Sequence, residues 1–330
     1  MVDEVHMSRA IELAGTARRR TAPNPWVGCV VVAGLDGRPV TFEGATAPPG
    51  GPHAEVSALR AAAQAGAAPE TLYSTLEPCA HHGRTPPCVD AIVAAGVGRV
   101  VVGVLDPDPQ VAGRGVARLE QAGIEVVVGV GAEAVAEQLA PYLKHRRTGR
   151  PWVVLKLAST LDGRTAAPDG TSRWITGAAA RADVHELRAH SDAVLVGAGT
   201  VRADDPELTV RTDRPPERQP LRVVLGAAPA TARVQPAVEL SGDLGGVLDE
   251  LGRRGVLQVL VEGGAGVAHD FHRAGLVDRY VIYLAPALLG GDDGRPLFAG
   301  PGAPTMDQIW RGRLVSVERL GDDLRVEVAA

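Results

Sequence analysis

Cysteine, lysine and aromatic residues are all scarce in this chain. Of its 330 residues, three are cysteines, 3% are aromatic, and the only lysines are Lys144 and Lys156. Three cysteines cannot build the disulfide framework of a small secreted domain, and a reducing compartment would keep them as thiols. Few aromatic rings leave little for the bases of a single-stranded nucleic acid to stack on. These shortages argue against a disulfide-stabilised protein and against a nucleic-acid-binding one.

Long apolar runs and a one-sided charge are absent as well. No apolar stretch reaches the roughly 20 residues that span a bilayer, and the start MVDEVHMSRA lacks the basic, then apolar order of a secretory signal. The chain has 34 basic and 39 acidic residues and a net charge of −5, so the basic excess of a nucleic-acid binder is missing. We expect a cytoplasmic protein with a small-molecule partner, no nucleic acid and no membrane. The sequence is also compatible with a homo-oligomer.

The chain is long enough for two domains. In its first part, helical and extended patterns alternate, and apolar strands separated by helices predict a three-layer α/β/α sandwich. Helices are expected at residues 2–19, 53–66, 86–96 and 111–123, and strands at 28–34, 39–44, 71–78, 99–107 and 124–130. In the first helix, Val5, Ile11 and Ala14 are expected to form the apolar face.

The segment YLKHRRTGRPWV, residues 142–153, interrupts this alternation with five basic or histidine side chains. We interpret it as a solvated interdomain hinge, and a phosphate or nucleic-acid contact is the functional alternative. A second α/β series follows and closes with a hairpin that turns near Gly321-Asp322. No internal repeat relates the two halves, so we expect two different domains, residues 1–147 and 148–330.

The stretch TLEPCAHHGRTPPC, residues 75–88, carries two cysteines and two adjacent histidines. A catalytic zinc site takes three protein ligands and leaves one position for water, whereas a structural site fills all four positions with side chains. Eight residues separate Cys79 from Cys88, which disfavours a structural zinc knuckle because its paired thiolates usually lie on one tight turn. The open coordination position also argues against His81 and His82 as ligands.

The sequence PHAEV, residues 52–56, followed downstream by Pro-Cys and a second cysteine, resembles the signature of the zinc nucleoside and nucleobase deaminases. The resemblance implies that His53, Cys79 and Cys88 bind Zn²⁺ and that Glu55 carries protons without binding the ion. Glu55 is two residues from His53, so on a regular helix the two side chains would point apart. We therefore expect His53 at the very start of its helix.

The long insert between the two cysteines and the turn PNPWVGCVVV, residues 23–32, resemble the deaminase domain of the bifunctional riboflavin-biosynthesis deaminase–reductases. This resemblance implies a cytidine-deaminase-like fold and a diaminopyrimidinone substrate that carries a phosphoribosylamino group. It places Asn24 at the ring or sugar of the substrate and Arg84 at its phosphate. Cys29 is interpreted as a buried small apolar residue.

Residues 260–275, LVEGGAGVAHDFHRAG, have the pattern of a strand, a glycine-rich turn and a helix. Such a turn suits a nucleotide phosphate, but the G-x-G-x-x-G pattern is incomplete, and a plain tight turn is the alternative. The stretches KLASTLDGRTA (156–166), SRWIT (172–176) and VGAGTVRADDPELTVR (196–211) resemble the reductase domain of the same family. That domain has a dihydrofolate-reductase-like fold and uses NADPH, so the resemblance covers nearly the whole chain.

The resemblance implies two sets of contacts in the second domain. The substrate set contains two arginines, whose planar guanidinium groups match a phosphate, and Lys156, which would polarise the opened ribose carbonyl or else form an ion pair with Asp162 or Asp204. The cofactor residues would be Ala158, Trp174, Thr200, Asp204, Gly264, Ala265, Gly266, Val267, Ala268, His269 and Asp270, and the substrate residues Lys156, Ser172, Arg188, Leu208, Arg211 and Glu262.

Residues 226–245 are shorter than is usual in this family and have little strand pattern. The loss of a strand or of a cofactor contact there would weaken NADPH binding. The sequence therefore predicts a bifunctional enzyme of riboflavin biosynthesis, which performs a zinc-dependent hydrolytic deamination and then an NADPH-dependent reduction of the ribosyl chain. The alternatives are an active deaminase with an impaired or inactive reductase domain, a nucleic-acid deaminase or binding module, and a structural zinc protein.

Overall fold

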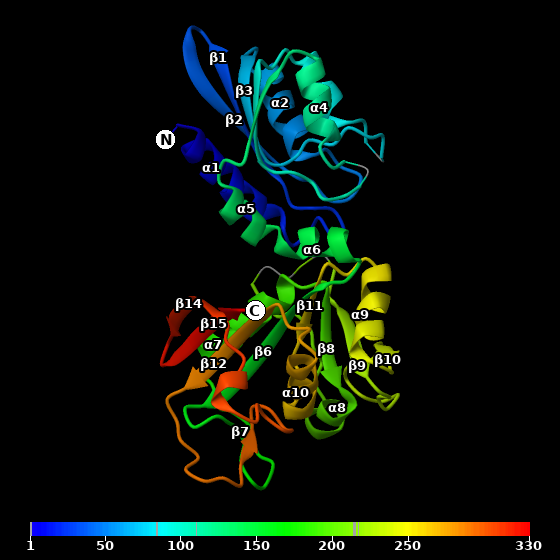
Figure 1. The fold of residues 1–330 in the computed structure, drawn as a ribbon, viewed down its shortest axis with the longest axis vertical. Helices are drawn as coiled ribbons and strands as arrows, with labels where there is room; N and C mark the ends of the chain where they lie inside the picture. Colours follow the sequence, from blue (N-terminus) through cyan, green and yellow to red (C-terminus); the bar gives the residue numbers. More distant parts are fainter. Residues whose placement is uncertain (1, 84, 110, 214–215, 217) are drawn as a thin grey trace. The chain divides into compact units, whose positions relative to one another are not determined.

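The computed structural model describes residues 2–83, 85–109, 111–213, 216 and 218–330 (Figure 1). The chain forms two compact units, Met1–Gly149 and Arg150–Ala330. No helix among the described residues is long and apolar enough to cross a membrane.

The N-terminal unit is built on a five-stranded sheet in the order β2-β1-β3-β4-β5. β1 pairs antiparallel with β2 and β3, and β3, β4 and β5 run parallel. Helices α1 and α5 cover one face of the sheet, and α2, α3 and α4 cover the other (Figure 1). The elements are α1 (Val2–Ala17), β1 (Gly28–Leu35), β2 (Arg38–Ala45), α2 (Ala54–Gln64), β3 (Ala68–Leu76), α3 (Cys88–Ala94), β4 (Arg99–Val104), α4 (Arg114–Gln121), β5 (Glu125–Val128), α5 (Ala132–Gln138) and α6 (Ala140–Thr148).

Helix α1 forms where the sequence predicts it, and its buried face includes the expected Ala14 but not Val5. The buried residues are Met7, Ala10, Ala14 and Ala17, while Val5 is 66% exposed. The reason lies in the sheet, because a Cβ atom on Gly28 would lie 1.9 Å from the carbonyl oxygen of Ala10. The backbones of α1 and β1 thus come into contact at Gly28, and only small side chains such as Ala10 and Ala14 fit at this crossing.

The basic segment at 142–153 contains the boundary between the two units, as expected, but its first part is not a solvated linker. Its first part lies in helix α6, which ends at Gly149 in the left-handed conformation with φ 73°. Tyr142 and Leu143 are buried, so the helix packs on its own unit although it carries the four consecutive basic or histidine residues 144–147. The rest of the segment enters the first strand of the second unit.

The C-terminal unit is built on an eight-stranded sheet in the order β10-β9-β8-β11-β6-β12-β15-β14. The strands from β10 to β12 are parallel, and the closing hairpin β14–β15 pairs antiparallel with β12. The elements are β6 (Trp152–Thr160), β7 (Arg164–Ala166), α7 (Ala178–Ala189), β8 (Ala193–Gly197), α8 (Ala198–Asp204), β9 (Leu221–Leu225), β10 (Val238–Leu240), α9 (Leu244–Arg253), β11 (Gln258–Val261), α10 (Ala265–Arg273), β12 (Arg279–Ala285), β13 (Arg295–Pro296), the 3₁₀ helix η1 (Met306–Gln308), β14 (Arg313–Leu320) and β15 (Asp323–Ala329).

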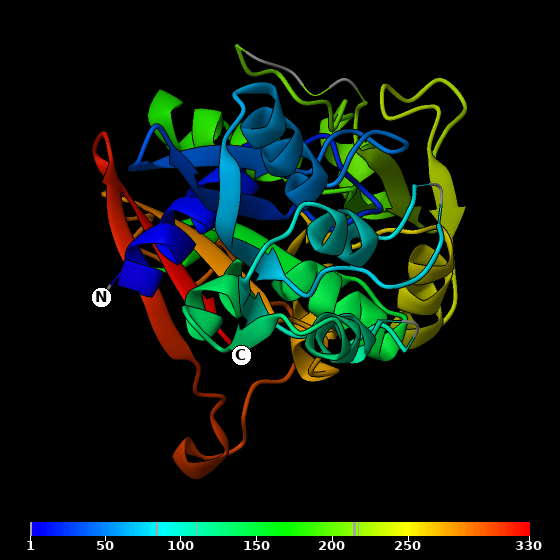
Figure 2. The same cartoon turned by 90° about the horizontal axis from the view of Figure 1, so that it is seen from above.

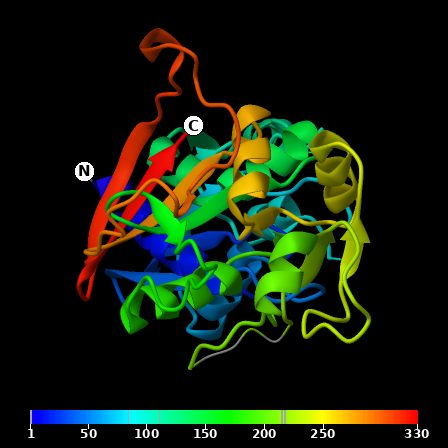
Figure 3. The ribbon, with the colours of Figure 1, turned by 90° about the horizontal axis from the view of Figure 1, so that it is seen from below.

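Two hydrophobic cores hold this unit together, one on each face of its sheet. Helices α9 and α10 pack on one face through side chains such as Leu251 and Phe271, and α7 and α8 pack on the other through Ala180 and Val201 (Figure 3). The segment between β13 and β14, with η1 in it, extends away from the sheet of this unit (Figures 2 and 3).

The shortened stretch at 226–245 keeps a strand. Val238–Leu240 form β10, which pairs in parallel with β9 at the edge of the sheet. The expectation of little strand structure is therefore wrong for these three residues. Around them the connection is irregular, as the sequence indicates, and α9 begins at Asp243, whose side chain accepts a hydrogen bond from the backbone N–H of Gly246.

Candidate functional site

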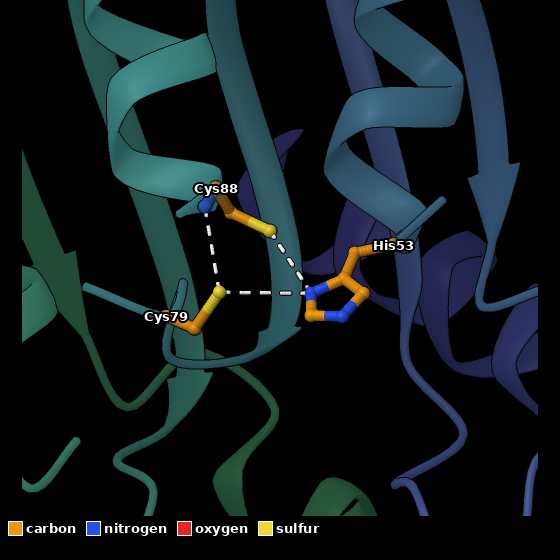
Figure 4. Close-up of side chains that lie close together, drawn as sticks. All are labelled: His53, Cys79 and Cys88. Atoms are coloured by element: carbon orange, nitrogen blue, oxygen red, sulfur yellow. Dashed lines mark hydrogen bonds between the residues drawn. The ribbon is translucent and has the colours of Figure 1, made fainter. Parts of the chain in front are cut away.

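Three metal-binding side chains meet where two helices of the N-terminal unit begin. His53 is the N-cap of α2, which confirms the expected place of this residue; Cys88 is the first residue of α3, and Cys79 lies in the loop after β3. Figure 4 shows the His53 ring facing both sulfurs, with Nδ1 3.2 Å from Cys88 Sγ and 3.6 Å from Cys79 Sγ. All three ligand atoms lie within 4.8 Å of one another.

The donor set and its spacing fit zinc. Zinc binds imidazole nitrogen and thiolate sulfur at about 2.0–2.3 Å in tetrahedral geometry, which puts two ligand atoms roughly 3.5 Å apart. The other ring nitrogen of His53, Nε2, lies 3.4 Å from Thr85 Oγ1. A hydrogen bond there would fix the ring so that Nδ1 faces the ion, as is usual for metal-binding histidines.

The two cysteines shift each other's pKa in opposite directions. A hydrogen bond from Cys88 lowers the pKa of Cys79 to about 4, and the same hydrogen bond, together with burial, raises the pKa of Cys88. The backbone N–H of Cys88 also donates to Cys79 Sγ, at 3.4 Å. A lowered pKa favours the thiolate, the form in which a cysteine binds zinc.

Glu55 lies next to the metal cluster and is buried, with only 3% of its surface exposed. Its Oε2 accepts a hydrogen bond from Cys88 Sγ at 3.6 Å, and burial raises its pKa above the ordinary value. A raised pKa makes a carboxylate a stronger base, which suits it to take up a proton during a reaction.

A cavity of about 350 Å³ opens onto His53, Glu55 and Cys79. Asn24 also lines it, as does His81, whereas Arg84 lies outside the described residues. Its volume is within the usual range for small-molecule sites. Further lining residues that the sequence analysis did not single out are Thr46, Glu77, Thr85, Asp106, Asp108, Val111, Tyr142 and Arg146.

Asp106 and Asp108 form one wall of this cavity, and the sequence contains a signal for them. The dipeptides Asp106-Pro107 and Asp108-Pro109 follow β4 almost directly, and ligands of parallel sheets bind beyond the carboxyl ends of the strands. Asp106 is buried, accepts hydrogen bonds from the backbone N–H of Asp108 and from the Tyr142 hydroxyl, and has its pKa raised mainly by burial.

Glu77 holds this wall in place. Its buried carboxylate accepts hydrogen bonds from the backbone N–H groups of four residues at 2.8–3.2 Å, which are Asp106, Gly113, Gly115 and Val116. A Cβ atom on Gly115 would lie 2.1 Å from the carbonyl oxygen of Pro78. The chain after β4 is therefore fastened to the residues that directly precede the metal ligand Cys79.

The C-terminal unit has its own, larger cavity of about 1230 Å³. It lies where β8 and β11 end and α8 and α10 begin, the usual ligand-binding edge of a parallel sheet. Trp174 lies at this cavity with 69% of its surface exposed, and the Arg181 guanidinium is 4.4 Å from its ring centroid. The cavity brings together Lys156, Ala158, Ser172, Trp174, Arg188, Thr200, Asp204, Leu208, Glu262, Gly264, Ala265, Gly266 and Val267.

Four residues expected in this site do not line the cavity. Ala268 is buried in the core, His269 faces a separate hollow on the other side of Gly300, and Asp270 follows them on α10. Arg211 is exposed and pairs with Glu207. The helix that begins at Gly264 thus lines the cavity only with its first residues.

A buried ion pair forms the floor of this cavity. Arg188 Nε and Nη2 donate to the two carboxylate oxygens of Glu262 at 2.6 and 3.0 Å, and its Nη1 donates to Thr209 O at 3.1 Å. Burial opposes ionisation of Glu262, but the arginine keeps the pKa of this carboxyl below its ordinary value. The nearest charges that act on Lys156 are also Glu262 and Arg188, and burial lowers its pKa. Asp162 instead accepts hydrogen bonds from Leu289 and Gly290.

Replacing Glu262 with alanine should destabilise the C-terminal unit strongly. The Arg188 and Glu262 side chains are only 12% and 9% exposed, and breaking a buried ion pair leaves an uncompensated charge at a cost of about 3–5 kcal/mol. Urea unfolding monitored by circular dichroism measures this loss. The matched control is Asp249→Ala, which removes an exposed pair with Arg150 and should have little effect on stability. Equal effects of the two substitutions would contradict the prediction.

Comparison with known proteins agrees with both halves of this description. A family model for the cytidine and deoxycytidylate deaminase zinc-binding region matches residues 1–104, and a model for the RibD C-terminal domain matches residues 151–326. The riboflavin biosynthesis protein RibD of Escherichia coli K12 is 41% identical, with 98% of each chain covered. RibD of Mycobacterium tuberculosis H37Rv is 44% identical, covering 100% of this chain and 97% of the relative.

Solved structures give the same result. A structure of Acinetobacter baumannii RibD superposes with a TM-score of 0.91 and 42% identity and covers 99% of this chain and 98% of its own. A diaminohydroxyphosphoribosylaminopyrimidine deaminase/5-amino-6-(5-phosphoribosylamino)uracil reductase from Thermotoga maritima does so with a TM-score of 0.89 and 37% identity, with the same coverage.

The fold and the sites define a bifunctional enzyme, in which a zinc-binding deaminase domain precedes an NADPH-dependent reductase domain. The chain belongs to the RibD family of riboflavin biosynthesis proteins. The cytidine-deaminase-like and RibD C-terminal folds expected from the sequence are confirmed.

Proposed function

We propose that this enzyme performs two consecutive steps of riboflavin biosynthesis on phosphoribosyl pyrimidines. The first is hydrolytic deamination of 2,5-diamino-6-(5-phosphoribosylamino)pyrimidin-4(3H)-one, and the second is reduction of 5-amino-6-(5-phosphoribosylamino)uracil to its ribitylamino form. The Thermotoga maritima relative is named for the same pair of activities. The observation that carries the proposal is the cluster of His53, Cys79 and Cys88 beside the buried carboxyl of Glu55, at a cavity that His53, Glu55 and Cys79 line.

In the deaminase domain, His53, Cys79 and Cys88 hold zinc. Zinc, when bound, supplies the Lewis acidity that lets a water molecule lose its proton near neutral pH. Glu55 accepts that proton and delivers it to the departing amino nitrogen. A carbon–oxygen bond forms, a carbon–nitrogen bond breaks, and ammonia leaves. Asn24 contacts the ring or sugar of the substrate, and Arg84 contacts its phosphate.

In the reductase domain, the start of α10 from Gly264 to Val267 receives the phosphates of the cofactor, because the backbone N–H groups of a helix N-terminus attract anions. NADPH, when bound, supplies the hydride. Lys156 donates a hydrogen bond to the ribose carbonyl and offsets the charge that develops on its oxygen. Ala158, Trp174, Thr200 and Asp204 complete the proposed cofactor set, and Ser172, Arg188, Leu208 and Glu262 the substrate set. The sequence resemblance also implied Ala268, His269, Asp270 and Arg211, which do not line the cavity.

We place the domain boundary at 147/148, and the division of the chain into units that meet at Gly149 and Arg150 supports a boundary in this region. We also propose that the enzyme works in the cytoplasm and takes no nucleic acid as substrate. The net charge of −5 and the small aromatic content support the second point. Whether the chain forms a homo-oligomer is an open part of the proposal.

A coupled assay tests the two steps separately. The zinc-loaded full-length protein, given the diaminopyrimidinone substrate and NADPH, should release ammonia and oxidise NADPH. Ammonia release without NADPH oxidation would instead support the alternative of an active deaminase with an impaired or inactive reductase domain. A titration of NADPH binding then distinguishes a domain that has lost its cofactor from one that binds it without turnover.

Glu77→Gln should weaken substrate binding in the deaminase while zinc is retained. The amide can accept fewer of the four backbone hydrogen bonds, and its NH₂ group opposes one of the N–H donors, so the wall that carries Asp106 loosens. The loss of one charge-assisted hydrogen bond predicts a rise in KM of about tenfold or more. Steady-state deamination kinetics and zinc analysis measure both quantities, with exposed Glu120→Gln as the control. A lower kcat at unchanged KM would argue against this positioning role.

A further inference from the structure

One basic side chain of α6 lies at the deaminase cavity. Of the four consecutive residues Lys144, His145, Arg146 and Arg147, only Arg146 is among the residues that line it. Arg147, its neighbour in the sequence, is exposed to solvent. Neighbouring basic residues of α6 therefore have different surroundings: Arg146 lies at the cavity, and Arg147 is exposed to solvent.

The Arg146 guanidinium is held from two sides. Its carbon Cζ lies 5.1 Å from the centre of the Tyr142 ring, a cation–π contact, and the Tyr142 hydroxyl is itself fixed by its hydrogen bond to Asp106 Oδ2 at 2.9 Å. On another side, Nε lies 3.7 Å from Asp108 Oδ2. Both side chains of this pair are largely covered, at 30% and 25% exposed.

The ion pair does not satisfy the arginine. A distance of 3.7 Å is too long for a hydrogen bond, and Nε is buried without a hydrogen-bond partner among the described residues. A guanidinium has five N–H donors in a planar fork. Arg146 is thus a desolvated cation, positioned by its neighbours and able to donate to an anion that enters the cavity.

The other charges of the cavity make such a cation necessary for a phosphorylated ligand. The carboxylates that line it are Glu55, Glu77, Asp106 and Asp108. Glu77 is occupied by four backbone N–H groups and Asp106 by Tyr142 and Asp108 N. A phosphate carries a charge of about −1.5 to −2 at pH 7, so it would be repelled from these walls without a compensating arginine.

We propose that Arg146 binds the phosphate of the deaminase substrate and makes this domain selective for phosphorylated over dephosphorylated pyrimidine nucleosides. The inference rests on the proposed function of the domain. It adds a specificity residue on α6, which lies outside the sequence motifs at residues 23–32, 52–56 and 75–88. The sequence resemblance assigns a phosphate contact to Arg84 as well, which lies outside the described residues.

The test compares two substrates on the full-length, zinc-loaded enzyme. One is the phosphoribosyl diaminopyrimidinone, and the other is the same compound after removal of its phosphate. Arg146→Met keeps the length and apolar contacts of the side chain but removes its charge. It should raise KM for the phosphorylated substrate about 10- to 100-fold, the size expected for one charge-assisted hydrogen bond, and leave KM for the dephosphorylated substrate unchanged. Arg147→Met is the matched control and should change neither value.

Arg146→Lys keeps the charge without the planar fork and should give an intermediate KM for the phosphorylated substrate alone. Equal increases of KM on both substrates would overturn the proposal, since they indicate that Arg146 only supports the wall through Asp108. Unchanged values in Arg146→Met would overturn it too. If the wild-type protein deaminates neither substrate, the proposed function itself fails, and that outcome is recognised before any variant is made.

Discussion

Glu55→Gln is expected to abolish deamination while the protein keeps its zinc. The glutamine has the shape of glutamate but cannot accept and return a proton, and general acid–base catalysis by one positioned side chain contributes about 10²- to 10⁴-fold to the rate. The kcat for ammonia release should therefore fall by at least about 100-fold. Reduction of the uracil intermediate by NADPH should not change, because it takes place in the other domain.

Zinc content, measured by atomic emission on the same samples, distinguishes loss of the proton carrier from loss of the zinc ion. One zinc ion per chain in both wild type and Glu55→Gln shows that the metal cluster is intact. Glu120→Gln, an exposed glutamate on α4 away from the cavity, serves as the control. Full deamination by Glu55→Gln would eliminate the assigned role of this residue and favour a purely structural zinc site.

Cys88→Ala should remove the zinc ion and deamination together. The substitution deletes one of three protein ligands, and the remaining His53 and Cys79 hold zinc far more weakly. The expected result is a protein with less than about one tenth of the wild-type zinc after dialysis and no measurable ammonia release, whereas NADPH oxidation with the uracil intermediate continues.

Cys29→Ala is the matched control for this experiment. Cys29 is fully buried in β1 and is not part of the metal cluster, so its alanine variant should keep zinc and deaminate normally. If Cys88→Ala bound zinc as tightly as the wild-type protein, the assignment of the ligands would be wrong. Loss of both activities would point to general unfolding instead, and circular dichroism would reveal it.

The features that could be predicted from the sequence are those carried by local pattern or by rare residue types. The alternation of apolar strands and helices predicts most elements of both units, and the placement of His53 at a helix start follows from its spacing to Glu55. Cysteine is so scarce in this chain that Cys79 and Cys88, with a nearby histidine signature, stand out. The catalytic roles given to these residues remain predictions.

The features that could not be predicted depend on contacts between distant segments. The buried face of α1 is set by Gly28 on β1, because their backbones touch, and no periodicity within the helix indicates this. Basic composition at 144–147 suggested solvent, yet the buried Tyr142 and Leu143 make the segment a packed helix. The position of Asp106 and Asp108 directly after β4 is a sequence signal, but the return of this loop to Glu77 is a contact between distant segments that no local pattern indicates.

The attachment of that loop to Glu77 has a thermodynamic consequence. Glu77 is two residues from Cys79, so one short piece of chain carries both a metal ligand and the clamp of the cavity wall. Occupancy of the ion and the shape of the pocket are therefore linked quantities. If the bound ion raises the affinity for a ligand by some factor, the bound ligand raises the affinity for the ion by the same factor. The enzyme should therefore lose its metal most slowly when a ligand fills its pocket.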